Sequence, residues 1–215
     1  MEIITDFEAL SNRADEIDTR KENALVREIV VKLKETIREH NLAGLSAPQI
    51  GYDKRIICLN FKGDIRSFIN PIIVNVEGLE MSRETCSSLP GKTFIRPRHN
   101  KIAIMSQTPL GKTESRTLIG LAAKVFQHEV DHLDGLLLSD VGLEIDDDFD
   151  KATTEEKAEI IKAYLDSLDI RQKGLEQEIQ EDKDLKQMSD AINFMTGVQK
   201  GEIKLVKHDE NTAEE

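Results

Sequence analysis

The sequence contains no tryptophan, only two cysteines and few aromatic residues, which make up 4% of its 215 residues. This composition excludes a disulfide-rich scaffold and a collagen-like chain. No apolar run approaches the roughly 18 residues that a membrane helix needs. Residues Met1 to Asp6 lack the basic and apolar regions of a secretion signal. We therefore expect Cys58 and Cys86 to be reduced, the protein to be cytoplasmic, and no membrane to be among its partners.

The formal net charge of −12 is concentrated in one part of the chain. Residues 144–215 contain 21 acidic and 10 basic residues, a net charge of −11, which leaves 20 acidic and 19 basic residues for residues 1–143. Acidic surfaces repel the phosphates of nucleic acids. The sequence therefore argues against direct nucleic-acid binding, and it predicts a nearly neutral body followed by an acidic extension.

The spacing of apolar residues predicts a fold of mixed type. The expected elements, in chain order, are a helix over residues 23–40, strands over 55–60, 68–76 and 101–105, a turn over 109–112, an extended segment through 117 and a helical segment over 118–138. Pro71 places a bend or a sheet edge at the start of the second strand. This order is typical of an α+β fold, with mostly antiparallel strands around a central helix.

The acidic extension predicts further helices. The acidic cluster at residues 146–150 is expected to be a solvated linker, and Thr153 with Glu156 has the spacing of a capping box at a helix start. Two apolar stripes follow, a stronger one at Ile160, Ile161, Tyr164, Leu165 and Leu168 and a weaker one at Leu185, Met188, Ile192 and Met195. Residues from His208 onward are expected to be disordered. We expect two domains, residues 1–143 and residues 144–215.

The strongest chemical signal is the motif His128-Glu129-Val130-Asp131-His132. Residues four apart lie on one face of a helix, so both imidazoles can face one metal ion. Glu129 then lies beside the metal, where it can take a proton from water. Because the surrounding segment is apolar, the imidazoles are expected to be buried, and buried imidazoles need partners.

A catalytic metal site of this kind usually has a third protein ligand. One class of metalloprotease places a third histidine downstream, but Leu138 occupies that position here, which excludes that class. A glutamate from the extension stays open as the third ligand of a metallopeptidase. Cys86 is the upstream candidate, whereas Cys58 lies within an apolar run and is expected to be a buried core residue.

Three segments in this order together resemble the peptide deformylase family. They are Gly44-Leu45-Ser46-Ala47-Pro48-Gln49, then Glu84-Thr85-Cys86-Ser87-Ser88, and then His128 to His132 followed by Leu133 and Gly135. The order and the spacing of the segments fit that family, as does the helix that precedes the first. The resemblance covers about residues 1–143, and three motifs in this order are much more specific than the histidine motif alone.

The resemblance implies a metal-dependent hydrolase that removes the formyl group from N-formylmethionyl peptides. It assigns Cys86, His128 and His132 as metal ligands and Glu129 as the general acid and base. It further implies that the Gln49 side-chain amide and the Ser87 backbone N–H stabilise the oxyanion, and that Gly44 lets the substrate backbone approach closely. The implied cofactor is one divalent ion, iron(II), with zinc, nickel or cobalt able to occupy the same site. A catalytically impaired binding module that kept the metal stays open as an alternative.

Several positions depart from the family pattern. Thr85 replaces a glycine, and a β-branched residue is energetically unfavourable there if the position needs a left-handed backbone. Ser46 replaces an alanine, and Lys124 stands where the family generally has an apolar residue lining the pocket for the methionine side chain. Lys124 either extends outward to solvent or gives the pocket a different preference. Arg98 and Asp131 match family positions and are expected to pair, with little energetic effect if the pair is exposed.

Some bacterial members of this family end in a basic helix that docks on the ribosome. The extension of this chain has the opposite charge, so we expect it to pack on the body or to bind a protein partner rather than RNA.

Overall fold

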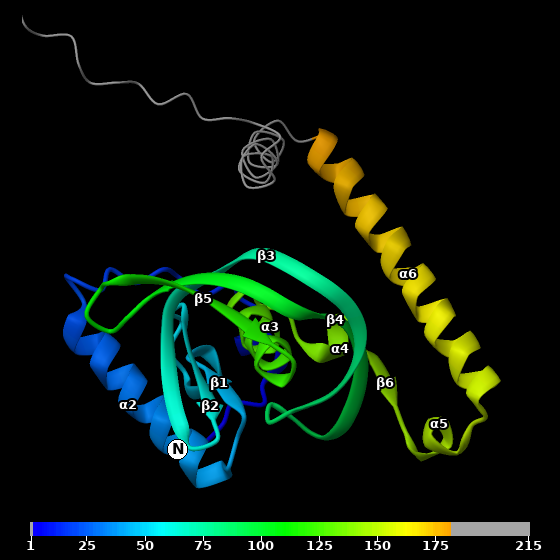
Figure 1. Cartoon of the computed structure of the whole chain (residues 1–215), viewed down its shortest axis with the longest axis horizontal. Coiled ribbons are helices and arrows are strands. Elements are labelled where there is room, and N and C mark those ends of the chain that lie inside the picture. The colour runs from blue at the N-terminus through cyan, green and yellow to red at the C-terminus, as the bar shows by residue number, and fades with distance from the viewer. Residues whose placement is uncertain (1, 182–215) are drawn as a thin grey trace, which may run out of the picture. The chain divides into compact units, whose positions relative to one another are not determined.

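The computed structural model describes residues 2–181 (Figure 1). In chain order, its helices are α1 (Phe7–Leu10), α2 (Asn23–His40), the 3-10 helix η1 (Pro48–Ile50), α3 (Leu121–Leu133), α4 (Leu138–Val141), α5 (Asp147–Lys151) and α6 (Thr154–Glu181). Its strands are β1 (Gly44–Ser46), β2 (Ile56–Phe61), β3 (Asp64–Cys86), β4 (Leu89–Gln107), β5 (Thr113–Ile119) and β6 (Leu143–Ile145). The first compact unit spans residues 1–152, and the second begins at Thr153.

The strands form one antiparallel sheet in the order β1-β2-β3-β4-β5, with β6 paired to the outer part of β4. The long strands β3 and β4 bend around α3, as Figure 1 shows. Helix α3 contacts β4, β1 and β2, so the segment with the histidine motif lies at the centre of the body. The predicted α+β fold with a central helix is therefore confirmed.

Helices α2 and α3 cover the two faces of the sheet, which explains why the first four residues of β2, 56–59, are all apolar. Ile56 and Cys58 belong to the core cluster that contains the buried face of α2. Ile57 and Leu59 belong to the cluster that contains the buried residues of α3. Because successive strand residues point to opposite faces, the part of a strand that is covered on both faces needs apolar residues at successive positions. Cys58 is fully buried, as expected of a core residue.

The predicted strands are present, but two of them are much longer than expected. The runs at 68–76 and 101–105 are the middle parts of β3 and β4, which pair along most of their length. Their outer halves carry many charged residues and contribute little to the apolar pattern, so periodicity alone did not identify them. The bend expected at Pro71 is confirmed: the register of β3 and β4 shifts between Ile69 and Ile72, and Asn70 has a positive φ of 47°.

The helix predicted over 23–40 is confirmed as α2, and Asn41 closes it in a left-handed conformation. The helical segment predicted over 118–138 was too long, because α3 covers only Leu121–Leu133. Gly120 and Gly135 have φ values of 63° and 72°, which end the helix on either side. At Gly135 a side chain has no room, since a Cβ atom would lie 2.5 Å from the Ser11 carbonyl oxygen.

The acidic linker expected at residues 146–150 is exposed for the most part but contains the short helix α5, capped by Asp146. The capping box at the start of α6 is confirmed: the Glu156 N–H donates to Thr153 Oγ1, and the Thr153 N–H donates to Glu156. Tyr164 is the buried member of the first apolar stripe, whereas Ile160 and Leu165 are partly exposed.

The second apolar stripe and the end predicted to be disordered lie outside the described residues. The division into domains at residues 143 and 144 stays a prediction. Among residues 2–181, no helix combines the length and the apolarity that crossing a bilayer requires.

Candidate metal centre and active site

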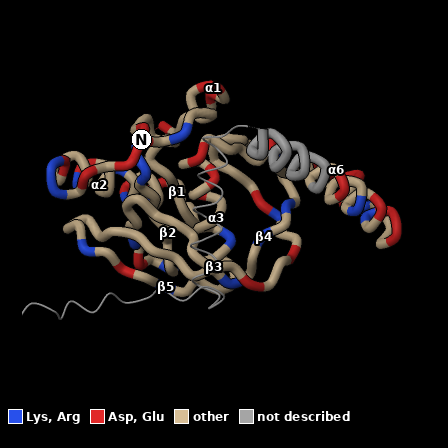
Figure 2. The backbone as a smooth tube through the Cα atoms, turned by 90° about the horizontal axis from the view of Figure 1, so that it is seen from above, with Lys and Arg blue, Asp and Glu red and all other residues tan. Residues whose placement is uncertain are grey.

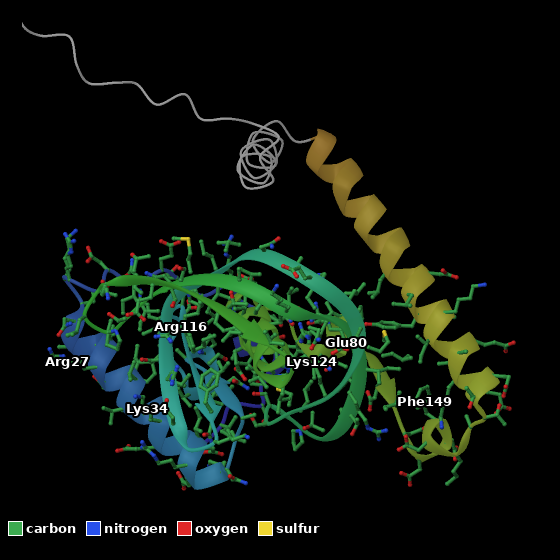
Figure 3. All side chains as sticks on the ribbon, viewed as in Figure 1. Arg27, Lys34, Glu80, Arg116, Lys124 and Phe149 are labelled. Carbon is green, nitrogen blue, oxygen red and sulfur yellow. The ribbon has the colours of Figure 1, made fainter. Side chains whose placement is uncertain are left out.

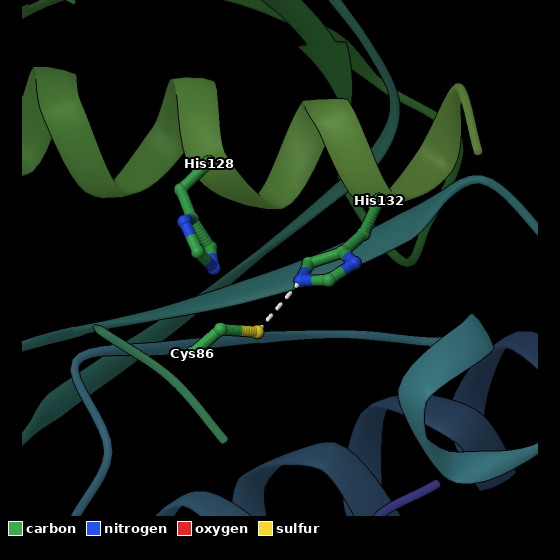
Figure 4. Close-up of side chains that lie close together, drawn as sticks. All are labelled: Cys86, His128 and His132. Carbon is green, nitrogen blue, oxygen red and sulfur yellow. Dashed lines mark hydrogen bonds between the residues drawn. The ribbon is translucent and has the colours of Figure 1, made fainter. Parts of the chain in front are cut away.

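Three side chains with ligand atoms for metals meet beside α3. One ligand atom from each of Cys86, His128 and His132 lies within 4.8 Å of the other two. The Cys86 Sγ and His132 Nε2 atoms are 3.2 Å apart. Figure 4 shows both imidazoles extending from α3 toward Cys86. All three residues were predicted as one site, and the fold brings them together.

Local structure explains this convergence. His128 and His132 are one helical turn apart on α3, so their side chains leave the helix on the same side. Cys86 is the last residue of β3, followed by the two-residue loop Ser87-Ser88, and it pairs with Leu89 at the start of β4. The register shifts between Thr85 and Cys86, which interrupts the regular strand at the thiol.

The three side chains fit a divalent metal ion in donor type and in electrostatic environment. A thiolate and two imidazoles are preferred ligands of zinc and of related first-row metals. Burial lowers the pKa of His128, but Cys86 and Glu84 beside it outweigh burial and raise that pKa to about 10. The surroundings of His128 therefore favour a positive charge. Burial holds the pKa of His132 well below its usual value, which keeps that imidazole neutral and able to bind a metal.

Glu84 fixes the orientation of His128, and sequence reasoning did not identify it. Its Oε2 atom lies 3.1 Å from His128 Nδ1, which leaves Nε2 of that ring for the site. Arg98 holds Glu84 with two hydrogen bonds of 2.8 and 2.9 Å, and it also donates to Asp131 at 2.6 Å. Burial alone would raise the pKa of Glu84, but the hydrogen bonds from Arg98 and His128 hold it well below its usual value.

The expected pairing of Arg98 with Asp131 is confirmed, but the pair is not exposed. The Arg98 side chain is only 3% exposed, so the network is buried and its loss is costly. His128 and the helix α3 that carries it are therefore held by ion pairs that link α3 to β3 and β4.

Glu129 lies buried between the metal-ligand candidates and β1. Its side chain is buried, and its Oε2 atom has no hydrogen-bond partner among the described residues. Burial raises the pKa of Glu129 to about 7, against the opposing influence of His128. A carboxyl group with a pKa near neutrality can both accept and return a proton.

The amide of Gln49 has one defined orientation. Its Oε1 atom accepts hydrogen bonds from the Ser46 N–H at 3.0 Å and from Ser46 Oγ at 2.9 Å. Its NH₂ group therefore faces the site, where it lies 3.1 Å from Ser88 Oγ and 3.8 Å from Cys86 Sγ. Gln49 is 1% exposed, so this donor is shielded from bulk solvent.

Gly44 and Ser87 both line the same cavity. At Gly44 the space for a side chain is filled from the side of α3: a Cβ atom would lie 2.7 Å from Val125 Cγ1 and 2.8 Å from Glu129 Oε1. A glycine here lets β1 approach the catalytic helix. Ser87 follows Cys86 in the loop, and its hydroxyl oxygen lies 3.4 Å from Gln49 Nε2.

A cavity of about 430 Å³ adjoins these residues. Cys86, His128, Glu129 and Gln49 lie in its wall. The rest of the wall comes from residues 41–44 before and within β1, from Ser82 to Thr85 on β3, and from Leu121, Lys124 and Val125 on α3. Two of the three ligand candidates, Cys86 and His128, are thus accessible from the cavity, whereas His132 lies buried behind its wall.

Two of the departures from the family pattern can be placed. Thr85 lies in an ordinary strand conformation, since it is not among the residues with positive φ. Its β-branched side chain therefore causes no backbone strain at this position. Lys124 does not extend freely into solvent: its side chain lines the cavity, is 23% exposed and pairs with Glu80 at 2.8 Å.

Gln127 is a second residue that sequence reasoning missed. Its side chain bonds both backbone groups of His99, accepting from the N–H at 3.0 Å and donating to the carbonyl at 2.8 Å. In the sequence, the signal that could have pointed to Gln127 was its position directly before His128. The partner on β4 is 28 residues away, and only the fold reveals it.

Comparisons with known proteins agree with this geometry. The family model described as polypeptide deformylase matches residues 2–146. A peptide deformylase of Dictyoglomus turgidum is 37% identical over 134 residues, covering 62% of this chain and 84% of that protein.

Solved structures of the same kind match the body. The peptide deformylase of Thermotoga maritima is 30% identical with a TM-score of 0.59, covering 62% of this chain and 90% of its own. The enzyme of the Vibrio parahaemolyticus bacteriophage VP16T, solved in complex with actinonin, is 32% identical with a TM-score of 0.59, covering 63% of this chain and 98% of its own.

Proposed function

The chain belongs to the polypeptide deformylase family, which consists of metal-dependent amide hydrolases, and we propose that it hydrolyses the formyl group of N-formylmethionyl peptides with Cys86, His128 and His132 as its metal ligands. The observation that carries these assignments is the approach of the three ligand atoms to within 4.8 Å of one another. Chance rarely brings a thiol and two imidazoles from distant segments into one buried position.

The proposed cofactor is one divalent ion, iron(II), with zinc, nickel or cobalt as ions that the same donors accept. Such an ion supplies Lewis acidity, which activates water for attack on a carbonyl carbon. The protein contributes the orientation of the ligands. Glu84 accepts from His128 Nδ1 and presents the other ring nitrogen to the site.

Glu129 is the proposed proton carrier. Hydrolysis forms a C–O bond at the formyl carbon and breaks the C–N bond, so one proton must travel from water to the leaving amine nitrogen. The Oε2 atom of Glu129 lies buried without another hydrogen bond among the described residues. A pKa raised to about 7 by burial suits a group that takes up and releases a proton in one cycle.

Gln49 and Ser87 are the proposed donors to the oxygen that becomes negative in the transition state. The amide of Gln49 already points its NH₂ group into the site, because Ser46 occupies its oxygen. Such fixed donors stabilise charge without reorganisation during the reaction. Ser87 would contribute its backbone N–H, which any residue except proline supplies. Gly44 would let the peptide backbone pass close to β1.

The test is release of formate from a formyl-Met peptide by protein prepared anaerobically with iron(II). We expect Cys86→Ala to lose both metal and activity. Cys58→Ala is the matched control, since Cys58 is also buried but lies in the core away from the cavity, and we expect it to keep both.

Two other outcomes would contradict the proposal. Full metal occupancy without formate release would favour a binding module. Metal and activity retained in Cys86→Ala would favour a metallopeptidase site with a different third ligand.

We further propose that the enzyme acts in the cytoplasm on newly made peptides, without direct contact to nucleic acid. The acidic extension supports this proposal, because its charge is unfavourable for RNA. A protein partner for the extension is part of the same proposal.

A further inference from the structure

The loop between β3 and β4 places two hydroxyl groups beside the amide of Gln49. The Gln49 Nε2 atom lies 3.1 Å from Ser88 Oγ and 3.4 Å from Ser87 Oγ. Ser88 is 2% exposed and does not belong to the cavity wall, whereas Ser87 is half-buried and lines the cavity. Ser88 therefore holds the amide from the protein side, and Ser87 is the one of the two that a substrate can contact.

One of the two N–H groups of Gln49 has no close partner. An amide nitrogen carries two N–H donors, and Ser88 takes one of them. The other atoms near Nε2 are Ser87 Oγ at 3.4 Å and Cys86 Sγ at 3.8 Å, and the first distance is long for a hydrogen bond between nitrogen and oxygen. An oxygen that enters the cavity can therefore take the second N–H without breaking a well-formed hydrogen bond.

The hydroxyl of Ser87 also keeps its hydrogen available. A hydroxyl group has one O–H donor and two acceptor lone pairs. Among residues 2–181, the hydrogen-bond partner of Ser87 Oγ is Gln49, from which it accepts. The O–H of Ser87 is therefore free to donate to a group in the cavity.

The charged donors of the cavity wall are held by carboxylates outside it. Lys124 Nζ pairs with Glu80 Oε1 at 2.8 Å, and Figure 3 shows the two side chains next to each other. Arg83 forms hydrogen bonds of 2.7 and 2.8 Å to Asp150 on α5. Neither Glu80 nor Asp150 belongs to the cavity wall. The donors beside Cys86 that remain for a substrate oxygen are therefore neutral groups.

We propose that the side-chain hydroxyl of Ser87 is a further catalytic donor, which hydrogen-bonds to the formyl oxygen together with the Gln49 amide. This inference rests on the proposed function and adds a side-chain donor to the backbone N–H of Ser87. Two donor atoms 3.4 Å apart can both lie about 2.8 Å from one oxygen. Because hydrogen bonds to a charged oxygen are stronger than those to a neutral one, the hydroxyl stabilises the transition state more than the bound substrate.

The experiment measures formate release from a formyl-Met peptide by Ser87→Ala, which keeps the backbone N–H. We expect kcat to fall about ten- to hundredfold with little change in KM. Ser87→Thr, which retains a hydroxyl group, should recover most of the activity. Ser67→Ala is the matched control, since Ser67 on β3 is also half-buried but lies outside the cavity wall, and it should leave kcat unchanged.

Two further measurements separate a direct donor from a residue that only positions Gln49. In a Gln49→Ala background, Ser87→Ala should still lower kcat about fivefold or more, because the hydroxyl contacts the oxygen itself. Calorimetry with two inhibitors provides a readout that does not depend on turnover. Ser87→Ala should weaken binding of a peptidyl hydroxamate, which carries a carbonyl oxygen, about tenfold, and it should leave binding of a peptidyl thiol, which carries none, unchanged.

The outcomes separate this inference from the proposed function. An unchanged kcat in Ser87→Ala overturns the inference and leaves deformylation intact. An effect that disappears in the Gln49→Ala background also overturns it, since Ser87 then acts only through Gln49. A loss of bound metal in proportion to the loss of kcat overturns it as well, since the hydroxyl then acts through Cys86. Absence of formate release from the natural sequence, with the metal bound, would overturn the proposed function itself.

Discussion

Ser46 determines which way the amide of Gln49 points. Its N–H and its hydroxyl both donate to Gln49 Oε1, and Ser46 is fully buried. The hydrogen bond from the hydroxyl is specific to serine at this position, because an alanine would still supply the backbone N–H. Ser46 is therefore a positioning residue for the proposed oxyanion donor.

We predict that Ser46→Ala lowers kcat about three- to tenfold with little change in KM, because one of the two hydrogen bonds that orient Gln49 is lost. Steady-state kinetics of formate release measure the effect, and metal content and melting temperature should stay unchanged. In a Gln49→Ala background the same substitution should have a smaller effect, and what remains comes from the hydrogen bond by which Ser46 also lowers the pKa of Glu129. An equal loss in both backgrounds would show that Ser46 acts independently of Gln49.

Glu84 contributes stability that depends on pH. Its pKa in the folded protein is held well below the usual value of about 4.5, chiefly by Arg98 and His128 acting against burial. A depressed pKa stabilises the folded state above the unfolded pKa, and this stability is lost as the pH falls below about 4.5.

We predict that Glu84→Gln lowers the free energy of unfolding at pH 6 by about 3 kcal/mol, because it leaves the buried Arg98 without its main partner. The variant should also lose less stability than the natural sequence between pH 5 and pH 3. Urea denaturation of the metal-free protein at several pH values measures both effects. Glu77→Gln, which removes an exposed partner of Lys101, is the control and should change stability by less than about 1 kcal/mol. Parallel pH profiles for Glu84→Gln and the natural sequence would contradict the prediction.

At the scale of elements, the position of α3 against the sheet depends on Gln127. Its amide bonds the N–H and the carbonyl of His99 on β4, as a neighbouring strand would. It also donates to the Ala123 carbonyl within α3. Because His128 follows directly, the link also fixes the part of α3 that carries the metal-ligand candidates.

We predict that Gln127→Leu lowers the free energy of unfolding by about 1–3 kcal/mol, since two backbone groups of His99 lose their partners. Chemical denaturation measures the loss. Hydrogen exchange locates it: the His99 amide should exchange faster, while β4 amides bonded to β3 stay protected. Unchanged exchange at His99 would show that the amide is held in another way.

At the scale of the whole molecule, the described site belongs to the first compact unit. Every predicted site residue, from Gly44 to His132, lies within residues 1–152, and the family match ends at residue 146. Asp150, which holds Arg83 at the cavity, is also part of this unit. Figure 2 shows acidic and basic residues interspersed over the tube of the body, in keeping with its nearly neutral charge.

We predict that a chain ending at Ala152 folds and releases formate at a rate within about twofold of the full chain, because it keeps the whole site. Circular dichroism and the formate assay check this. Neither chain should co-sediment with ribosomes at low salt, because acidic residues outnumber basic ones both in residues 153–215 (16 against 9) and in residues 1–152 (25 against 20). Co-sedimentation that depends on residues 153–215 and weakens with salt would contradict the prediction.

The sequence by itself determined the chemistry of this protein and the kinds of its main elements. A helix turn fixes the relation of His128 to His132, and strand or helix periodicity depends only on near neighbours, so both could be inferred locally. The same reasoning overestimated the length of α3 and underestimated β3 and β4, because their ends depend on backbone conformation and on pairing.

Only the tertiary structure decided which distant residues serve the site. The pairing of Glu84 with His128 and Arg98, the link from Gln127 to β4, and the ion pair of Lys124 with Glu80 all join segments far apart in the chain. Local spacing carries no information on such contacts, since they arise when the bent sheet closes around α3. The cavity beside Cys86 and His128 also follows from that closure, since its wall comes from β1, β3 and α3.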